Sequence, residues 1–558
     1  MGKSTLTLTM MTLLSRVSGQ VRAILLVLAI GATGMVADAF DVANNIPASL
    51  NLILTGGIFN AILVPQFVKA KRFKNADERI NKLLTLALCF MFAVTLILTV
   101  GASVAISVIS SPQWTAQQFN LAVFFGFICM PQVFFYGLFT LLGQVLAAKE
   151  RFGMLGFAPV VNNIVSCAVL VFYILLTGGQ AGDGANINAL TIGEVLLLGV
   201  GSTAGIAAQA LILIIPLKRI KFKFRLVFGV HGFGLRKVAK LALYSFLSIL
   251  IEQVSSLFIV SLVSGAPAEA AKRYNLAGEQ LLAIGGNAAW SNALIIYIIP
   301  HSLITVSLVT ALFTALTKQA SKGNTTEVAR QYIRGSCINI FAINFFTFLF
   351  IVLALPIVRT LIPSASQVGA LAIATGVVAL STKLVVAGLS QMTTRVFFAY
   401  EKTKWYFLID LPEQILQIAL CLIAVAIVPP ELWLFALGLA SSVSLWLGTF
   451  ACIFVVHKRI LAGHADIKKI TATLFKTSIA GGASGVVLHI LQCAWTHQPV
   501  LSFPSIGFIG SSWPESLAQC VVGTLIMGAV YYAVCIMLRV PEAKELLDKL
   551  PRTILRRR

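Results

Sequence analysis

The sequence predicts an all-α polytopic membrane protein with about fourteen transmembrane helices. Hydrophobic residues make up 58% of the 558 positions and charged residues only 11%, whereas soluble domains have about 45–50% apolar and about 25% charged residues. Apolar windows about 20 residues long, sufficient to cross a bilayer, follow one another along the whole chain. Basic residues concentrate in alternate connections, which is the orientation signal of a multi-pass protein. The composition therefore excludes a soluble protein.

Fourteen apolar windows account for these spans. Their predicted limits are 5–30, 39–67, 83–110, 120–147, 155–177, 194–216, 241–263, 287–317, 335–356, 368–395, 406–427, 432–456, 472–493 and 517–538. The first window contains Arg16 and Arg22 and lacks a short apolar core with a small-residue cleavage site. It is therefore expected to be a membrane helix and not a cleaved signal peptide.

The distribution of Lys and Arg predicts the orientation. With the amino terminus on the cytoplasmic side, 35 of the 42 basic residues fall in cytoplasmic segments, and only Lys272, Arg273 and Arg359 fall in outer loops. Both termini are thus predicted to be cytoplasmic. The net charge of +22 then reflects membrane orientation and anionic lipid, and we expect no nucleic-acid partner. None of the nine cysteines forms a Cys-x-x-Cys pair, so no metal site is predicted.

An internal repeat predicts the domain organisation. The segment that starts at Val145 matches the segment that starts at Val396, at an offset of 251, and spans 2 and 8 match more weakly at an offset of 250. Six spans therefore repeat in the same orientation, as in transporters built from parallel repeats. The predicted parts are a six-helix lobe at 1–217, a basic cytoplasmic linker at 218–240, a second six-helix lobe at 241–457, an extra helix pair at 458–538 and a basic cytoplasmic tail at 539–558.

Polar residues within the spans are candidates for function because ionisable groups are costly inside a bilayer. Ser15, Ser18 and Arg22 share one face of span 1, and Arg16 lies beside them; span 7 carries Glu252. Asp38, Asp41 and Asn45 form a stripe on span 2. Two interpretations stay open: an arginine pairs with Asp38 to fix helix packing, or spans 1, 2 and 7 line a hydrated cavity that selects an anionic headgroup.

A second group of residues, which includes Asp41 and Asn45 of the span 2 stripe, is expected to serve packing or bending. Asn162 and Asn163 place two amides near the middle of span 5, where hydrogen bonds between helices are the commoner explanation. Pro47 and Pro300 interrupt spans 2 and 8, as expected for helices that bend during alternating access.

The sequence contains no motif that predicts an enzyme. Gly2-Lys3-Ser4 lacks the upstream glycine of a phosphate-binding loop. No long extramembrane segment could house ATP hydrolysis, so transport is expected to draw on ion gradients or on the membrane potential. We expect no cofactor, and coupling to sodium or protons stays open.

Several motifs resemble those of the MurJ/MviN family of lipid II flippases, which belongs to the multidrug/oligosaccharidyl-lipid/polysaccharide exporter superfamily. The matching segments are 15–22, 37–40, 42–47, 157–163 and 395–399. The amino-acid sequence from Met130 to Gly137 is similar to that of actinobacterial members of the family. The resemblance implies fourteen spans in two six-helix lobes plus an extra pair, and a bacterial cytoplasmic membrane location.

The resemblance also implies a function and a site. The function is movement of lipid II, an undecaprenyl-diphosphate-linked disaccharide peptide, to the outer leaflet by alternating access, with Arg16 and Arg22 as the important arginines of span 1. Two departures stand out, because Asn51 and Ile295 occupy positions where many relatives carry arginines. Other partners could be membrane lipids and cell-wall synthesis or regulatory proteins at the cytoplasmic loops.

Four rival functions stay open at this point. They are flipping of another polyprenyl-diphosphate-linked glycan, a transport-dead scaffold for cell-wall synthesis, a drug/cation antiporter and a membrane glycosyltransferase. The antiporter is disfavoured because two cavity arginines would repel a cation. The glycosyltransferase is disfavoured because the outer loops 178–193 and 494–516 carry only Asp183 and Glu515.

Overall fold

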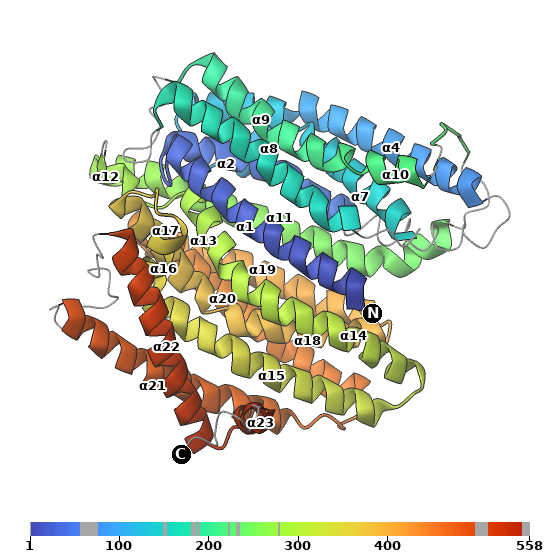
Figure 1. Cartoon of the computed structure of the whole chain (residues 1–558), viewed down its shortest axis with the longest axis vertical. Helices are drawn as coiled ribbons and strands as arrows, with labels where there is room; N and C mark the ends of the chain where they lie inside the picture. The colour runs from blue at the N-terminus through green and yellow to red at the C-terminus, as the bar shows by residue number, and fades with distance from the viewer. Residues whose placement is uncertain are drawn as a thin grey trace. The chain divides into compact units, whose positions relative to one another are not determined.

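The structure, a computed structural model, describes residues 2–55, 76–148, 153–179, 187, 190–220, 222, 224–229, 235–276, 279–496 and 512–549. Helices make up nearly all of this part of the chain (Figure 1). They divide into two compact units, one formed by residues 1–288 and 364–369 and the other by residues 289–363 and 370–558. The all-α class predicted from composition is confirmed.

The first unit holds helices α1 to α12. Their bounds are α1 (Gly2–Ile30), α2 (Met35–Asn51), α4 (Ala76–Val100), α5 (Ala102–Ile109), α6 (Ala116–Cys129), α7 (Gln132–Ala148), α8 (Gly153–Thr177), α9 (Ile192–Leu211), α10 (Ile214–Arg219), α11 (Leu235–Tyr274) and α12 (Glu279–Leu282). α13 (Asn287–Pro300) starts in this unit and continues into the second.

Except for residues 367–369 at the start of α17, which group with the first unit, the second unit holds the remaining helices. They are the π-helical turn η2 (His301–Thr305), α14 (Val306–Ser321), α15 (Thr325–Val352), α16 (Ala354–Leu361), α17 (Gln367–Ser381), α18 (Leu384–Ala399), α19 (Thr403–Ile427), the 3₁₀ turn η3 (Pro430–Leu432), α20 (Trp433–Val455), the π-helical turn η4 (Val456–Ile460), α21 (Ile467–Thr496), α22 (Trp513–Met537) and α23 (Pro541–Lys549).

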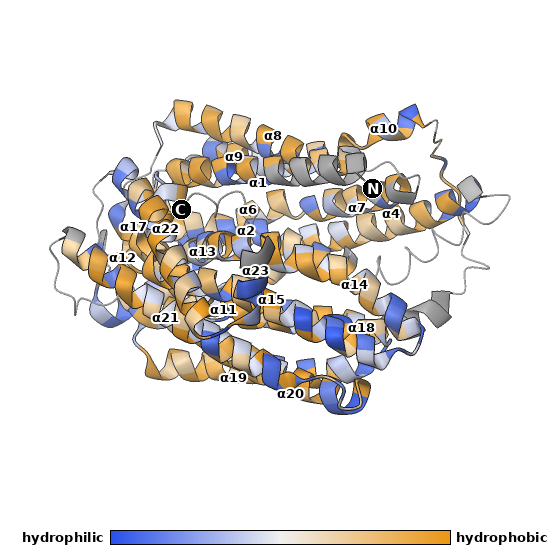
Figure 2. Cartoon of the chain, turned by 60° about the horizontal axis from the view of Figure 1, so that its bottom comes forward, coloured by the Kyte–Doolittle hydropathy of each residue, from blue (hydrophilic) through white to orange (hydrophobic). Residues whose placement is uncertain are grey.

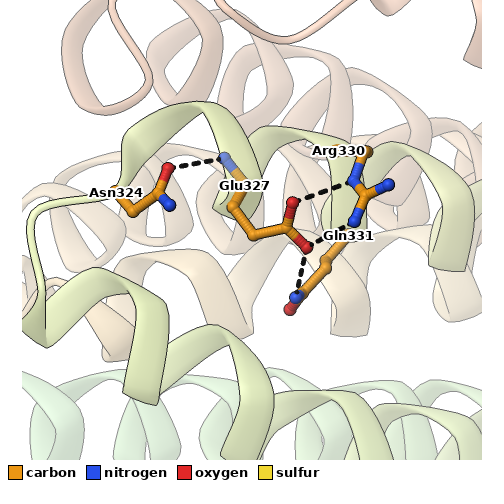
Figure 3. Close-up of polar contacts among 4 residues, drawn as sticks. All are labelled: Asn324, Glu327, Arg330 and Gln331. Carbon is orange, nitrogen blue, oxygen red and sulfur yellow. Dashed lines mark hydrogen bonds and ion pairs between the residues drawn. The ribbon is translucent and has the colours of Figure 1, made fainter.

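Local sequence sets several of the helix ends. Thr191 and Glu194 form a capping box at the start of α9, which satisfies two backbone donors that the helix leaves free. Asn324 accepts a hydrogen bond from the Glu327 backbone N–H at 3.1 Å at the start of α15 (Figure 3). Gly34 has a φ of 107° between α1 and α2, and glycine adopts this backbone conformation without steric cost.

Within the first unit, α1 packs along α8, and α8 packs along α9 (Figure 1). One apolar core is built from α1, α2, α5, α6 and α9, with Phe40 and Phe125 in edge-to-face contact at 5.1 Å between ring centroids. A second core lies between α4 and α7. In the second unit, α15 packs on α21, and α19 packs on α20.

The described residues contain 11 helices long and apolar enough to cross a membrane, or up to 12 if the pair α17 and α18, bent by 44°, counts as one span. Figure 2 shows hydrophobic residues along most of these helices, α8 and α19 among them. The chain is therefore a multi-pass membrane protein. Residues 56–67 of the predicted second span lie outside the described part, and the count of fourteen stays a prediction.

The unit to which α11 belongs can be compared with the predicted lobe boundaries. The repeat predicts this helix as the first of the second lobe, but its contacts with α2, α5 and α12 group it with the first unit. Trp114 Nε1 donates to the Ser264 carbonyl at 2.8 Å and so fastens α11 beside the α5–α6 connection. The predicted lobe boundaries at 217 and 241 stay predictions.

Candidate functional site

The acidic stripe of α2 faces the start of α13. Asp38 Oδ1 accepts a hydrogen bond from the Ala288 backbone N–H at 2.8 Å. Asp41 Oδ2 accepts from Asn287 Nδ2 at 2.6 Å and from Asn45 Nδ2 at 2.8 Å. A helix amino terminus carries unpaired N–H donors and a positive dipole end, which stabilise a carboxylate placed there. The stripe that the sequence marked as functional therefore holds the first turn of α13.

Burial and a glycine make this contact close. Asp38 is 1% exposed and Asn287 is 0% exposed. A Cβ atom at Gly286 would overlap the Asp38 carboxylate group. Glycine is thus required at this position for the carboxylate to reach the helix end.

The structure separates Asp38 from the span 1 arginines. Among the described residues, no ion pair joins Asp38 to Arg16 or to Arg22, and the carboxylate bonds to α13 instead. Arg16 is partly buried, and its Nε has no hydrogen-bond partner within the described part of the chain. The arginine–Asp38 pair of the packing interpretation is therefore absent from the described residues, and Asp38 contacts α13 instead.

Ser15, Ser18 and Asn163 join α1 to α8. Asn163 Nδ2 donates to the Ser15 carbonyl at 2.9 Å and to Ser18 Oγ at 3.0 Å. Ser18 Oγ also donates to the Ser15 carbonyl at 3.1 Å. The Ser15 carbonyl and the Ser18 hydroxyl thus form a helix contact, and the substrate-binding role predicted for these serines stays a prediction.

Asn162 lies at the contact of α8 with α9. Its Oδ1 accepts from Ser166 Oγ at 3.3 Å. A Cβ atom at Gly205 would lie 2.5 Å from both Asn162 Oδ1 and Ser166 Oγ. The glycine lets α9 approach these polar groups closely, as small residues do in membrane helix contacts.

Arg22 lines a cavity of about 60 Å³ inside the first unit. Its polar lining is completed by Asn44, Ser166 and Ser202, and apolar residues of α1, α2, α8 and α9 form the remainder. The cavity has room for water and for the guanidinium group to meet polar partners. In this cavity the structure puts a predicted arginine beside an internal polar surface.

A hydrogen-bond network missed by the sequence analysis borders this cavity. Asn44 Oδ1 accepts from Ser202 Oγ at 2.6 Å and from Gln132 Nε2 at 3.1 Å. Gln132 Nε2 also lies 3.3 Å from Ser202 Oγ and from Thr203 Oγ1. Gln132 follows Pro131, and Ser202 and Thr203 follow Gly201, all within apolar spans. An isolated polar group in an apolar span was therefore the signal that could have indicated these residues.

Asn51 and Glu252 lie apart from the network. Asn51 ends α2, and its buried Oδ1 has no hydrogen-bond partner among the described residues. Glu252 lies on an exposed side of α11, although Ser248 and Ser255 on the same helix are buried. The structure therefore does not place either residue in contact with the Arg22 cavity.

The predicted proline breaks coincide with changes in the backbone. Pro47 lies inside α2, which continues as a π-helical turn over residues 52–55. Pro300 ends α13 and is followed directly by the π-helical turn η2. Proline removes a helical hydrogen bond and so favours such a change of winding. The two π-helical turns recur at a spacing that agrees with the offset of 250 in the sequence repeat.

The second unit has its own buried polar groups. Asp410 is 5% exposed on α19, and Glu413 on the same helix lies against Gly448 of α20. Lys383, at the bend between α17 and α18, lies over the Tyr297 ring at 5.7 Å from its centroid. Within the described residues, no group of three His, Cys, Asp or Glu side chains is placed to hold a metal ion.

Long apolar helices joined by buried polar contacts define a polytopic membrane protein. The family described as "Lipid II flippase MurJ" matches residues 27–506, which is most of the chain. The chain therefore belongs to the MurJ lipid II flippase family, as the resemblance in the sequence predicted.

Curated relatives agree with this assignment. The chain is 34% identical over 174 residues to "Lipid II flippase MurJ" of Burkholderia cenocepacia, an alignment that covers 30% of this chain and 34% of the relative. It is 28% identical over 269 residues to "Probable lipid II flippase MurJ" of Synechocystis sp., covering 47% and 49% of the two chains. The chain thus spans about a third to a half of the length of these relatives.

Solved structures share the fold. "Lipid II flippase MurJ, inward closed conformation" superposes with a TM-score of 0.69 at 16% identity, over 95% of this chain and 99% of that chain. An inward-facing multidrug resistance MATE family transporter of the MOP superfamily superposes with a TM-score of 0.55 at 14% identity, over 81% of this chain and 94% of that chain.

Proposed function

We propose that this protein moves lipid II from the cytoplasmic to the outer leaflet of the bacterial cytoplasmic membrane by alternating access, without catalysing a reaction. The observation that carries the proposal is the match of the lipid II flippase family over residues 27–506. Positive charge on α1 supports it, because the diphosphate of a polyprenyl-linked precursor requires cationic partners within the membrane.

Arg16 and Arg22 are the proposed contacts of the diphosphate. Arg22 lines a polar cavity, and Arg16 keeps a buried Nε without a hydrogen-bond partner in the described part of the chain. A guanidinium group donates two parallel hydrogen bonds to phosphate oxygens, which a lysine cannot reproduce. Asp38 and Asp41 have a supporting role in this proposal, since they hold the start of α13.

The membrane potential is the proposed driving force. An inside-negative potential favours outward movement of an anion by about 2.3 kcal/mol per charge per 100 mV. The distribution of basic residues supports cytoplasmic termini. Collapse of the potential alone, with sodium and proton gradients clamped, would separate this mechanism from ion coupling.

Depletion of the protein in its native bacterium tests the function. After depletion, lipid II at the outer leaflet should fall, as measured by its accessibility to an impermeant modifying enzyme, and restored expression should return it. Unchanged accessibility after depletion would refute the assignment. Competition between purified lipid-linked glycans for the protein then separates lipid II from other polyprenyl-diphosphate substrates.

Single substitutions test the two arginines. Arg16→Ala and Arg22→Ala should each slow transport ten- to hundredfold, because each removes a charge-assisted contact of about 1.5–3 kcal/mol. Lys322→Ala, which removes an exposed cation, is the matched control and should transport normally. Normal growth of the Arg16/Arg22 double variant after depletion of the native protein would favour a scaffold role instead.

A further inference from the structure

A charged pocket lies at one end of the second unit, and none of the residues that line it is assigned to transport. Its volume is about 620 Å³, within the range of about 300–1,000 Å³ typical of small-ligand sites. It lies between the first turns of α15 and α21, beside the short helix α23 (Figure 1). The charged residues that line it are Arg330, Arg334, Lys469, Lys476, Arg539, Asp466, Glu542 and Glu545.

Helical spacing brings the cations to this pocket. Arg330 and Arg334 are four residues apart on α15, and Lys469 and Lys476 are seven residues apart on α21. Residues with these spacings share one face of a helix. The four side chains of two helices therefore point toward a common space.

The turn from α22 into α23 closes the pocket. Arg539 follows Leu538, the C-cap residue of α22, and has a φ of 54°, a left-handed conformation typical of a helix end. Tyr532 Oη then donates to the Ala543 carbonyl at 3.0 Å, and Val540 and Ala543 are buried. These contacts fix the side of α23 that carries Glu542 and Glu545 against the pocket.

Three of the five cations already have carboxylate partners. Arg330 forms two 2.9 Å hydrogen bonds with Glu327, as Figure 3 shows. Arg334 pairs with Glu545, and Lys469 lies 3.7 Å from Asp466.

The remaining two cations, Lys476 and Arg539, form no salt bridge among the described residues. Lys476 Nζ donates to the Arg539 backbone carbonyl at 3.4 Å, and its positive charge also favours the ionised form of Glu542. Burial raises the pKa of Glu542, so this opposing charge is lost at a higher pH than for an exposed carboxylate. The pocket thus combines five cations, three carboxylates and a concave shape.

We propose that this pocket binds a phosphate group, carried by an anionic membrane lipid or by a soluble phosphate compound, with Lys476 and Arg539 as its main contacts. Arg and Lys donate strong charge-assisted hydrogen bonds to phosphate oxygens. Basic pockets at the cytoplasmic ends of membrane helices are places where anionic headgroups bind. A concave pocket suits a small group, whereas a protein partner needs a larger and flatter surface.

The test compares two double variants of the full chain. Lys476→Gln/Arg539→Gln removes the two cations of the pocket that form no salt bridge among the described residues. Lys318→Gln/Lys322→Gln removes the same charge from exposed positions at the end of α14, outside the pocket. Purified proteins in phosphatidylcholine nanodiscs are titrated with phosphatidylglycerol, and separately with glycerol phosphate and inorganic phosphate.

The wild-type protein should bind at least one phosphate probe in preference to phosphatidylcholine. The pocket variant should bind about thirtyfold more weakly, two losses of the size expected for a basic residue at an anionic surface. The control variant should bind normally, and Lys476→Arg should retain binding. Binding of phosphatidylglycerol without competition from glycerol phosphate identifies a lipid ligand, and competition identifies a soluble one.

Two results would overturn the proposal. One is absence of binding of all three probes to the wild-type protein, and the other is an equal loss in the pocket and control variants. Helix content and elution volume confirm that each variant is folded. If Lys476→Gln/Arg539→Gln does not fold, the single Lys476→Gln variant should still bind several-fold more weakly, and unchanged binding would count against the pocket.

Discussion

Removal of the Asp38 carboxylate tests whether α2 holds the start of α13. Asp38→Ala loses a hydrogen bond of a charged acceptor to the Ala288 N–H, worth about 1.5–3 kcal/mol. It also loses the interaction with the positive end of the helix dipole, worth about 0.3–1 kcal/mol. We therefore expect a loss of about 2–4 kcal/mol in the free energy of unfolding.

Two further variants make the measurement specific. Asp38→Asn keeps the volume and one acceptor oxygen, so it should lose about 1–2 kcal/mol, the part due to charge. Glu78→Gln breaks an exposed pair with Lys82, in which Glu78 is 50% exposed, and should lose less than about 0.5 kcal/mol. Denaturant unfolding of the purified chain in micelles, followed by helical circular dichroism, gives all three values.

The result that would refute this reasoning is a similar small loss for Asp38→Ala and Glu78→Gln. In that case the buried carboxylate would not stabilise α13. An independent perturbation of the same contact is Gly286→Ala, whose added Cβ overlaps the carboxylate group. It should destabilise about as much as Asp38→Ala, and its effect should largely vanish when Asp38 is already absent.

Two other helix contacts give further predictions. Gly205→Ala places a Cβ atom against two α8 side chains and should lose about 1–3 kcal/mol of unfolding free energy. The control is Gly193→Ala on the same helix, whose added Cβ has no atom closer than 4.0 Å, and it should leave the unfolding free energy unchanged. Equal effects of the two variants would exclude close packing as the cause. Asn163→Ala removes two hydrogen bonds to α1 and should lose about 0.6–1.7 kcal/mol in the same assay. A value within error of wild type would show that this contact does not hold α1.

Apolar windows located the helices well but underestimated their lengths. The predicted span 335–356 covers the apolar part of α15, which begins ten residues earlier at Thr325, and runs into the start of α16. The predicted span 472–493 likewise lies inside α21 (Ile467–Thr496). A hydropathy window responds only to the hydrocarbon region, whereas backbone hydrogen bonding continues the helix into basic sequence. These extensions carry Arg330, Arg334 and Lys469, and they form the phosphate pocket that the sequence did not reveal.

The partners of the buried polar residues could not be predicted from the sequence. Helical spacing placed Asp38, Asp41 and Asn45 on one face of α2. In the structure this face contacts the start of α13. The partners Asn287 and Ala288 follow about 250 residues later, and a one-dimensional pattern contains no information on that distance. The available signal was Gly285-Gly286-Asn287 before an apolar run, which is typical of a helix start with a close backbone approach.

The bend between α17 and α18 could not be predicted from proline, which marked the breaks at Pro47 and Pro300. Pro47 and Pro300 mark changes of winding, but the 44° bend has Thr382 and Lys383 at its centre and no proline. Thr382 Oγ1 lies within hydrogen-bond distance of Ser442 Oγ at 2.5 Å and also donates to the Ala379 carbonyl. A side chain that bonds to the preceding turn competes with the helix ladder and bends it. Such a bend depends on a tertiary neighbour, here α20.

The two ends of α13 differ in how firmly they are held, and this relates the acidic stripe to transport. Its first turn is fixed by hydrogen bonds from Ala288 and Asn287 to α2 carboxylates. Its last residue is Pro300, and a π-helical turn with a less regular backbone follows. A bend in this continuous helix therefore costs least after Pro300. Because the chain passes from the first unit to the second within α13, loss of Asp38 should weaken the anchored end and affect transport without any direct contact between Asp38 and the substrate.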